Sequence, residues 1–324
     1  MKHKIAFFIG FIFLASQIFF APAVNAEGEF FKDVPKGSDY FTAIQYLKKA
    51  DLLDKNGDLF DTGKEMSRAE AVYYILKIIL GYAPESNMKL TLKPFLDVPA
   101  ESILAPYIKT AVELKIINGY ENKKFLPHKR ILLAEAIKMV LETEKLINNS
   151  IVFSAPAEES AAPEISTAAP AENIFADVPA NVWFAPYAKL AREKRIIKFG
   201  KSDEMEPSEI VTKGYLMEIL YRLIRSREGI NFGIASYYHK TLEGGHTSSG
   251  ESFSNKNFTA AHRKLPFGTR VRVTNLRNSK TVEVVINDRG PYAKNFTLDL
   301  SQAAFSSIAP LSNGIIPIEY LIIQ

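Results

Sequence analysis

The sequence predicts a multidomain protein in which all-α helical repeats are followed by a small, closed β-barrel. Three observations support this: one pentapeptide pattern occurs three times between residues 31 and 179, apolar residues inside the copies recur at steps of three and four, and beyond Gly229 the pattern changes to strand-like alternation. The 324 residues include no cysteine, which excludes a disulfide scaffold, thiolate metal sites, a cysteine nucleophile and an acylated lipoprotein cysteine. Ordinary buried cores must therefore stabilise each part.

The amino terminus is typical of an export signal. Basic residues at positions 2 to 4 precede an apolar run over residues 5–20, and small residues at cleavage-type positions end at Ala26. We expect residues 1–26 to be a signal peptide cleaved after Ala26; an uncleaved anchor is the alternative, because about 20 apolar residues can span a bilayer. The mature protein would be secreted, would be associated with the cell wall in the envelope, and would have no contact with the membrane.

The repeated pentapeptide marks three divergent copies of one helical unit. It begins at Phe31, Phe95 and Phe175, and each time it ends in Asp-Val-Pro. Each copy then continues with a helix, a polar loop and a second helix, and Ser67 with Glu70 fits a capping box at the second helix of the first copy. The aspartates of the three copies are expected to be turn-forming caps: Asp33, Asp97 and Asp177. A helix pair this short cannot bury its own faces, so the copies must pack together.

The copies are expected at residues 27–90, 91–150 and 174–228, with a tether at residues 151–173. The tether is rich in Ala, Pro, Glu and Ser between residues 154 and 172, a composition typical of a flexible, partly extended linker. It interrupts the array of copies. The sequence therefore leaves open whether the three copies form one compact unit.

These repeats resemble the S-layer homology module, whose pattern runs from Phe-x-Asp-Val-Pro to a Thr-Arg-Ala-Glu-like box at the second helix. The box is Ser67-Arg68-Ala69-Glu70 in the first copy, and the other two copies lack its arginine. The resemblance implies one pseudo-threefold unit of three modules that docks on secondary cell-wall polysaccharide through the box arginine. Arg68 is therefore expected to bind a wall polymer, and a buried or solvated structural arginine is the alternative.

Residues 229–324 predict the barrel. Val271 and Val273 alternate with polar residues, and the same alternation returns over residues 282–286 and 316–322. Ser301 can cap one short helix, and the turn sequences between the strands leave no long loop. Several short strands and one helix in about 95 residues suit a small closed barrel.

Charge is concentrated in this barrel rather than spread along the chain. The whole sequence carries a formal charge of +4, but residues 231–324 alone hold ten Lys and Arg against six Asp and Glu. Such a surface would attract an anionic polymer such as peptidoglycan, whose carboxylates lie on lactyl groups and stem peptides. We expect no nucleic-acid partner, because an exported protein rarely meets nucleic acid and no helix-in-groove motif occurs.

Six motifs follow one another in order within the barrel region. They are Gly-Ile-Ala-Ser-Tyr-Tyr from Gly233, Thr-Ser-Ser-Gly-Glu from Thr247, Thr-Ala-Ala-His-Arg-Lys-Leu-Pro-Phe-Gly-Thr from Thr259, Val-Arg-Val-Thr-Asn-Leu from Val271, Asn-Asp-Arg-Gly-Pro from Asn287 and Asp-Leu-Ser from Asp299. Together they resemble the rare lipoprotein A-like domain, a double-psi β-barrel related to the expansin barrel. The resemblance covers residues 233–323.

This resemblance implies a lytic transglycosylase of peptidoglycan. Such an enzyme cleaves between N-acetylmuramic acid and N-acetylglucosamine, and the muramyl 6-hydroxyl attacks to leave a 1,6-anhydro end. The positions that match essential family residues are Asp288 and His262, and Glu251 matches a further polar position. We expect substrate contacts from the remaining polar residues of the motifs: Tyr238, Arg263 and Arg289 beside Glu251.

Glycosidic cleavage explains why a carboxyl group is needed. One carboxylic acid must protonate the leaving oxygen, and its carboxylate can then take the proton of the 6-hydroxyl. Asp288 would need a raised pKa for both steps, which a strand end near the apolar barrel can supply, although Arg289 and the basic surroundings act in the opposite direction. His262 would orient the substrate or stabilise developing charge.

Structural roles are the alternatives to these catalytic roles. Asp288 can be an ordinary turn aspartate, and His262 a surface base. No metal or cofactor is expected, because the three histidines of the barrel lack a metal-ligand spacing: His239, His246 and His262. Two other functions compete with catalysis: a non-catalytic, expansin-like module that binds glycan, and a structural protein of the surface layer.

Overall fold

The computed structural model describes residues 30–54, 57–84, 95–152, 175–198, 203–293 and 295–323. The predicted signal peptide and nearly all of the predicted tether lie outside these residues. The described residues form two compact units: one from residues 63–191 and 205–216, the other from residues up to 62, 192–204 and 217–324. The borders of these units differ from the borders of the sequence copies, since the start of the first copy belongs with the barrel.

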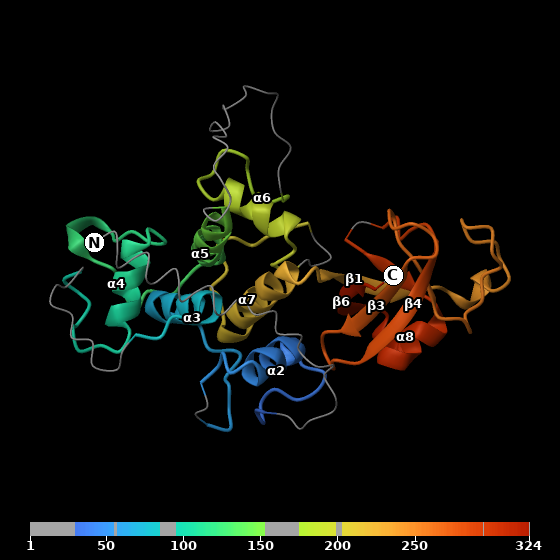
Figure 1. The fold of residues 1–324 in the computed structure, drawn as a ribbon, viewed down its shortest axis with the longest axis horizontal. Helices are drawn as coiled ribbons and strands as arrows, with labels where there is room; N and C mark the ends of the chain where they lie inside the picture. Colours follow the sequence, from blue (N-terminus) through green and yellow to red (C-terminus); the bar gives the residue numbers. More distant parts are fainter. Residues whose placement is uncertain are drawn as a thin grey trace. The chain divides into compact units, whose positions relative to one another are not determined.

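Each copy supplies two helices, as the apolar spacing predicts (Figure 1). The helices are α2 (Phe41–Lys49) and α3 (Arg68–Leu80), α4 (Ala105–Glu113) and α5 (Leu133–Val152), and α6 (Ala185–Glu193) and α7 (Lys213–Arg227). The capping box at α3 is confirmed, because the Ser67 side chain accepts from the Glu70 amide while the Glu70 carboxylate accepts from the Ser67 amide at 3.0 Å. The box fixes the start of the helix by pairing two amide groups that the helix itself leaves unpaired.

The aspartate of each pentapeptide has the same structural role, but it binds a loop 27–29 residues further along the chain instead of capping its own turn as predicted. Each carboxylate accepts two hydrogen bonds from consecutive backbone amides in the loop before the second helix. The amides belong to Phe60 and Asp61 for Asp33, to Phe125 and Leu126 for Asp97, and to Met205 and Glu206 for Asp177, at 2.6–2.8 Å. Each copy therefore closes its own loop.

In the first unit the three copies meet in a closed ring of backbone hydrogen bonds. The Met66 amide donates to the Val211 carbonyl at 2.9 Å, the Ile131 amide to Met66 at 3.0 Å, and the Val211 amide to Ile131 at 3.0 Å. These residues precede α3, α5 and α7, so each copy donates to one neighbour and accepts from the other. The tether that interrupts the array therefore does not keep the copies apart.

The second unit contains a closed barrel in the strand order β1-β5-β2-β4-β3-β6. Its strands are β1 (Asn231–Tyr237), β2 (Thr259–Ala261), β3 (Arg270–Asn275), β4 (Thr281–Asp288), β5 (Leu298–Leu300) and β6 (Ile316–Ile322), with α8 at Gln302–Ile308. β1 pairs with β5 and β2 with β4 in parallel, and the other pairs are antiparallel. Alternate apolar residues fill the interior, as the sequence pattern predicts.

Within this second unit, α7 packs against the barrel through a buried polar cluster. The Tyr221 hydroxyl donates to the Glu319 carboxylate of β6 at 2.5 Å, and Arg225 pairs with the same carboxylate at 3.1 Å. Glu319 is only 6% exposed. A buried carboxylate is tolerated when charged and hydroxyl donors surround it, so this cluster joins helix and barrel as one folded body.

Candidate active site on the barrel

Asp288 ends β4 and is held by four donors. Its Oδ1 accepts from the Ser248 amide at 2.8 Å, the Ser248 hydroxyl at 2.7 Å and the Arg289 amide at 2.8 Å, and its Oδ2 accepts from the Tyr238 hydroxyl at 2.7 Å. A register shift in the β2–β4 ladder places Asp288 opposite Ala261. The carboxylate is therefore fixed in one orientation, half-buried at the end of a barrel strand.

A second carboxyl group lies in the same row of the barrel wall. Ala261 of β2 pairs with Asp288 on one side and with Asp299 of β5 on the other, and Asp299 pairs in turn with Ser236 of β1. Paired residues on adjacent strands share a face, so the two carboxyl groups flank a small alanine with their backbones about 10 Å apart. The Ser236 hydroxyl donates to Asp299.

The two carboxyl groups have pKa values shifted in opposite directions. Burial raises the pKa of Asp288, but the hydrogen bonds from Ser248, Tyr238 and the Arg289 amide outweigh burial and hold its pKa below the ordinary value. Burial raises the pKa of Asp299, the Ser236 hydrogen bond lowers it, and the nearby charge of Asp288 raises it again, so its pKa lies above the ordinary value. Strand-end burial is therefore insufficient to give Asp288 the raised pKa that the one-carboxyl scheme requires.

His262 follows Ala261 and is joined to Asp288 through the backbone, because its amide donates to the Asp288 carbonyl at 3.2 Å. Its ring Nδ1 accepts from the amides of Lys264 at 3.1 Å and Leu265 at 2.9 Å. Two amide donors on Nδ1 place the proton of the neutral ring on Nε2. Burial, and then the positive charges nearby, lower the pKa of His262, so the ring is neutral at neutral pH.

The other predicted substrate residues differ in what they contact. Tyr238 donates to Asp288, and burial with that hydrogen bond raises its pKa, so its hydroxyl keeps the proton it donates. Glu251 is exposed and accepts from the Asn287 side chain at 2.9 Å. Arg263 instead donates to the carbonyls of Pro291 and Ala293. These contacts place Tyr238 and Glu251 beside the residues around Asp288, while Arg263 stabilises a loop.

Arg289 also binds main-chain oxygen. Its Nη1 donates to the Leu265 carbonyl at 2.9 Å, and its guanidinium lies 3.7 Å from the centroid of the Phe267 ring. It therefore stabilises the loop that carries His262. Ser248 and Asp299 also belong to the site; the sequence did not predict a role for either, although both lie within the quoted motifs.

Arg68 is largely buried in the first unit, where it is 7% exposed. Its Nη2 donates to the Asn118 carbonyl at 2.9 Å, and its guanidinium lies 5.1 Å from the Tyr120 ring centroid and 4.9 Å from that of Phe125. These contacts favour the alternative of a structural arginine. Its role toward a wall polymer stays a prediction.

Within the described ranges, no group of three or more His, Asp and Glu side chains is arranged to hold a metal ion. Among the same residues, no helix combines the length and apolar character that crossing a bilayer requires.

Comparison with known proteins agrees with the motifs. The family described as "Lytic transglycolase" matches residues 230–320, and the S-layer homology domain matches residues 30–72 and 94–137. The chain is 42% identical over 109 residues to the "Endolytic peptidoglycan transglycosylase RlpA" of Pasteurella multocida, and 51% identical over 86 residues to the probable enzyme of that name in Synechocystis. These matches cover 33% and 26% of this chain and 37% and 27% of the relatives.

Among solved structures, a Clavibacter michiganensis expansin is 24% identical, with a TM-score of 0.26 over 29% of this chain and 50% of that chain. The curated relatives match the barrel region alone, and the chain spans well under half of their length. The third copy lies outside the S-layer homology match, although it repeats the aspartate contacts of the other two. The chain thus carries an RlpA-like double-psi β-barrel domain of the lytic transglycosylase type, preceded by S-layer homology repeats that imply association with the cell surface.

Proposed function

We propose that this protein is an exported lytic transglycosylase that cleaves peptidoglycan between N-acetylmuramic acid and N-acetylglucosamine. The observation that carries the proposal is the Asp288 carboxylate, which four donors hold at the end of β4 while His262 directly follows the paired strand β2. Fixed orientation is what a catalytic group needs, since a misplaced acid or base loses most of its rate advantage. The named relatives support the reaction class for the barrel domain.

In the proposed reaction, Asp288 acts as the base. Its lowered pKa keeps the carboxylate ionised at neutral pH, so it can take the proton of the muramyl 6-hydroxyl. The 6-oxygen then forms a bond to C1 of the same sugar while the bond from C1 to the glycosidic oxygen breaks. The products are a 1,6-anhydromuramyl end and a free 4-hydroxyl on the next sugar, and no water is consumed.

The leaving oxygen needs a proton, and we assign that step to Asp299. Its raised pKa makes it the better proton source of the two carboxyl groups in the row. Neutral His262 can donate a hydrogen bond through Nε2 toward oxygen atoms that gain negative charge. This assignment replaces the scheme in which Asp288 serves both steps.

We further propose that the helical repeats hold the enzyme at the wall. In the first unit a hollow of about 420 Å³ is lined by the basic residues Lys64 and Arg130, by His128, by Glu70, and by apolar side chains such as Val98. Its two basic side chains suit an anionic wall polysaccharide. Supporting this role, the S-layer homology match covers both copies that line the hollow.

The test is product analysis on purified, peptide-stripped glycan strands. We expect 1,6-anhydromuramyl products from the wild type and a loss of at least ~100-fold with Asp288→Asn, the scale of a removed general base. The exposed Asp58→Asn is the matched control and should keep full activity, because Asp58 contacts Lys32 and not the barrel site. Glycan binding without any product from the wild type would favour the non-catalytic, expansin-like function instead.

A further inference from the structure

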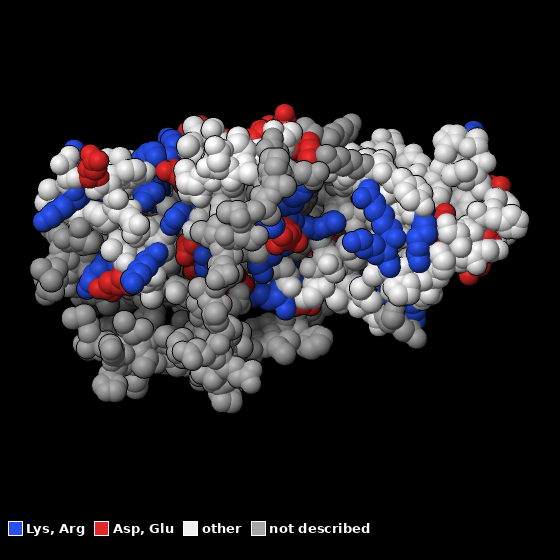
Figure 2. Space-filling model, turned by 90° about the horizontal axis from the view of Figure 1, so that it is seen from above, with Lys and Arg blue, Asp and Glu red and all other residues white. Residues whose placement is uncertain are grey.

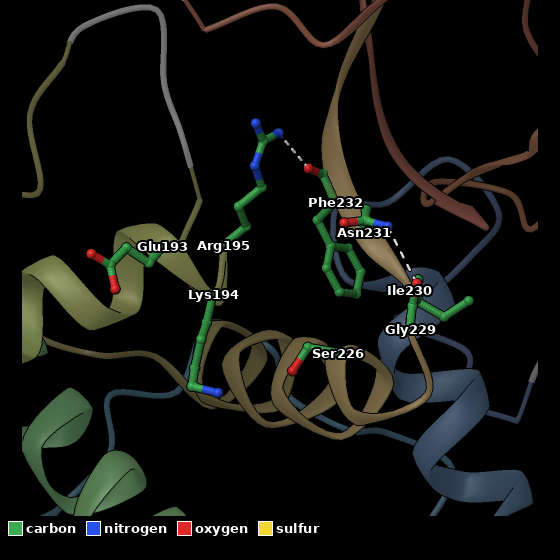
Figure 3. A pocket seen from close by; sticks show the side chains of 8 residues that line it. All are labelled: Glu193, Lys194, Arg195, Ser226, Gly229, Ile230, Asn231 and Phe232. Carbon is green, nitrogen blue, oxygen red and sulfur yellow. Dashed lines mark hydrogen bonds between the residues drawn. The ribbon is translucent and has the colours of Figure 1, made fainter. Parts of the chain in front are cut away.

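Arg195 belongs to the third helical copy but binds the barrel within the second unit. It lies in the connection after α6, and its Nη1 donates to the Phe232 carbonyl of β1 at 2.7 Å and to the Thr297 hydroxyl at 2.9 Å. Figure 3 shows the guanidinium directed toward β1 and away from Lys194, at the edge of a pocket of about 270 Å³. Thr297 is buried and stands two residues before Asp299.

The same guanidinium lies within electrostatic range of His262. Among the charged groups, Arg195 has the largest electrostatic effect on His262, ahead of Arg289, Arg263 and Lys264. It acts in the same way on Tyr320, whose ring centroid is 6.1 Å from that of His262. The contacts agree, because Arg195 binds Phe232, the neighbouring residue Asn231 pairs with Tyr320, and the Tyr320 ring approaches His262. An arginine from outside the barrel therefore belongs to the neighbourhood of the predicted catalytic histidine.

Arg195 differs from its basic neighbours in the guanidinium donors that remain available to a ligand. Arg263 gives both Nε and Nη2 to backbone carbonyls, and Arg289 lies against an aromatic ring. The Arg195 side chain is exposed, and only its Nη1 makes hydrogen bonds with the described residues. Its Nε and Nη2 thus offer donors to an incoming anion, and a guanidinium binds a carboxylate best through two parallel donors.

Figure 2 shows Lys and Arg side chains gathered on the visible face of the barrel. A basic surface concentrates anionic polymers but does not select one carboxylate by geometry. Selection needs a donor with fixed position, and the two hydrogen bonds of Nη1 give Arg195 that position.

We propose that Arg195 forms a carboxylate subsite beside His262, which takes a carboxylate of the peptidoglycan strand and so couples the third helical copy to substrate choice. The inference rests on the proposed function for the identity of the polymer. Two sources share this chemistry: the lactyl carboxylate of each muramyl residue and the carboxylates of stem peptides. The experiment separates them by using strands with and without peptides.

Binding is measured at low salt with three probes: peptide-free muramyl oligomers with free lactyl carboxylates, the same oligomers with the lactyl groups converted to primary amides, and peptide-bearing oligomers whose lactyl groups are in amide linkage. We expect Arg195→Gln to weaken binding of the free-acid oligomer about tenfold, the scale of one charge-assisted contact. Binding of the amide oligomer should change less than about twofold. If Arg195→Gln weakens binding of the peptide-bearing oligomers as much as that of the free-acid oligomer, the stem peptide supplies the carboxylate.

Arg272→Gln is the matched control, since Arg272 is an exposed barrel arginine that pairs with Glu283 at 2.8 Å. Arg195→Lys keeps the charge without the planar fork and should recover part of the affinity. As a second readout, the pKa of the His262 ring in the wild type should rise when the free-acid oligomer binds, because a carboxylate then offsets the charges of Arg195, Arg263, Lys264 and Arg289 near the ring and near Tyr320. In Arg195→Gln that rise should be absent.

Equal loss of affinity for free-acid and amide oligomers would overturn the subsite, and so would an unchanged affinity for both. If Arg195→Gln lowers the melting temperature, Arg195→Lys is used for the comparison. The readout is then the ratio of the affinities for free-acid and amide oligomers, because misfolding lowers both affinities equally and leaves their ratio unchanged. Carboxylate-dependent binding through Arg195 with no anhydro product would remove the transglycosylase proposal and leave the subsite standing. Anhydro products from a protein whose binding does not depend on the carboxylate would support the transglycosylase proposal and remove the subsite.

Discussion

At the scale of single residues, the protonation of Asp288 depends on side chains far away in the sequence. Ser248 supplies two of its donors, and Tyr238 supplies another. They meet because strand pairing through Asp299 and Ala261 puts the end of β1 and the end of β4 in one row. A motif identifies such a residue, but its pKa belongs to the folded neighbourhood.

Replacing Ser248 with alanine should raise the pKa of Asp288, because the carboxylate loses the hydroxyl donor at 2.7 Å that favours its charged form. The measurement is an NMR titration of the Asp288 carboxyl carbon. Ser249→Ala is the matched control, since the Ser249 hydroxyl pairs with Thr247 instead. An Asp288 titration that is identical in Ser248→Ala and wild type would show that the hydroxyl does not set the pKa.

At the scale of elements, the sequence predicted the helices and the strands β3, β4 and β6, but neither the strands β1, β2 and β5 nor the long-range partners of any element. Apolar spacing located α3 and the capping box at Ser67, because both depend on residues a few positions apart. The ring through Met66, Ile131 and Val211 joins residues of different copies, so no local pattern predicts it. Arg195 illustrates the same limit for the site, since its neighbours are in another element.

Asp97 offers a test of loop closure within a copy. Asp97→Ala should lower the free energy of unfolding by about 1–3 kcal/mol, because two amides lose their acceptor. Burial raises the pKa of Asp97, but the amides of Phe125 and Leu126 outweigh burial and lower it. The contribution is therefore present above the unfolded pKa of about 3.9 and is lost as pH falls through the lower folded value.

Chemical denaturation between pH 7 and pH 2 measures this difference for wild type and Asp97→Ala. The gap between the two proteins should shrink as the solution becomes more acidic. The exposed Asp39→Ala provides the comparison, because Asp39 forms a surface ion pair with Arg277. A gap that does not change with pH would mean that the carboxylate charge is not what closes the loop.

At the scale of the whole molecule, the second unit combines the barrel with parts of two helical copies. Its buried Glu319 is shared by Tyr221 and Arg225 of α7, so the barrel's last strand and a repeat helix depend on one carboxylate. The third sequence copy and the barrel are therefore expected not to unfold independently of each other. A deletion that removes the copies would also remove buried partners of β6.

Glu319→Gln should destabilise the second unit by about 1.5–3 kcal/mol, the range for hydrogen bonds to charged groups. Thermal unfolding followed separately by a helix signal and by barrel side-chain resonances should show that α7 and the barrel melt earlier together. Glu283→Gln is the matched control, because Glu283 is an exposed glutamate with two arginine partners. Barrel resonances that melt at the wild-type temperature while α7 melts earlier would contradict the shared body.

The ring of Met66, Ile131 and Val211 has a consequence for how the chain reaches its final form. A newly made chain emerges in order, and the segment at Met66 must wait for Val211, which is added well after the second copy is finished. Until then, the hydrogen bonds that Met66 and Ile131 make with Val211 cannot form. Synthesis that stops before residue 211 would therefore leave two copies with unpaired backbone groups, a form prone to aggregation.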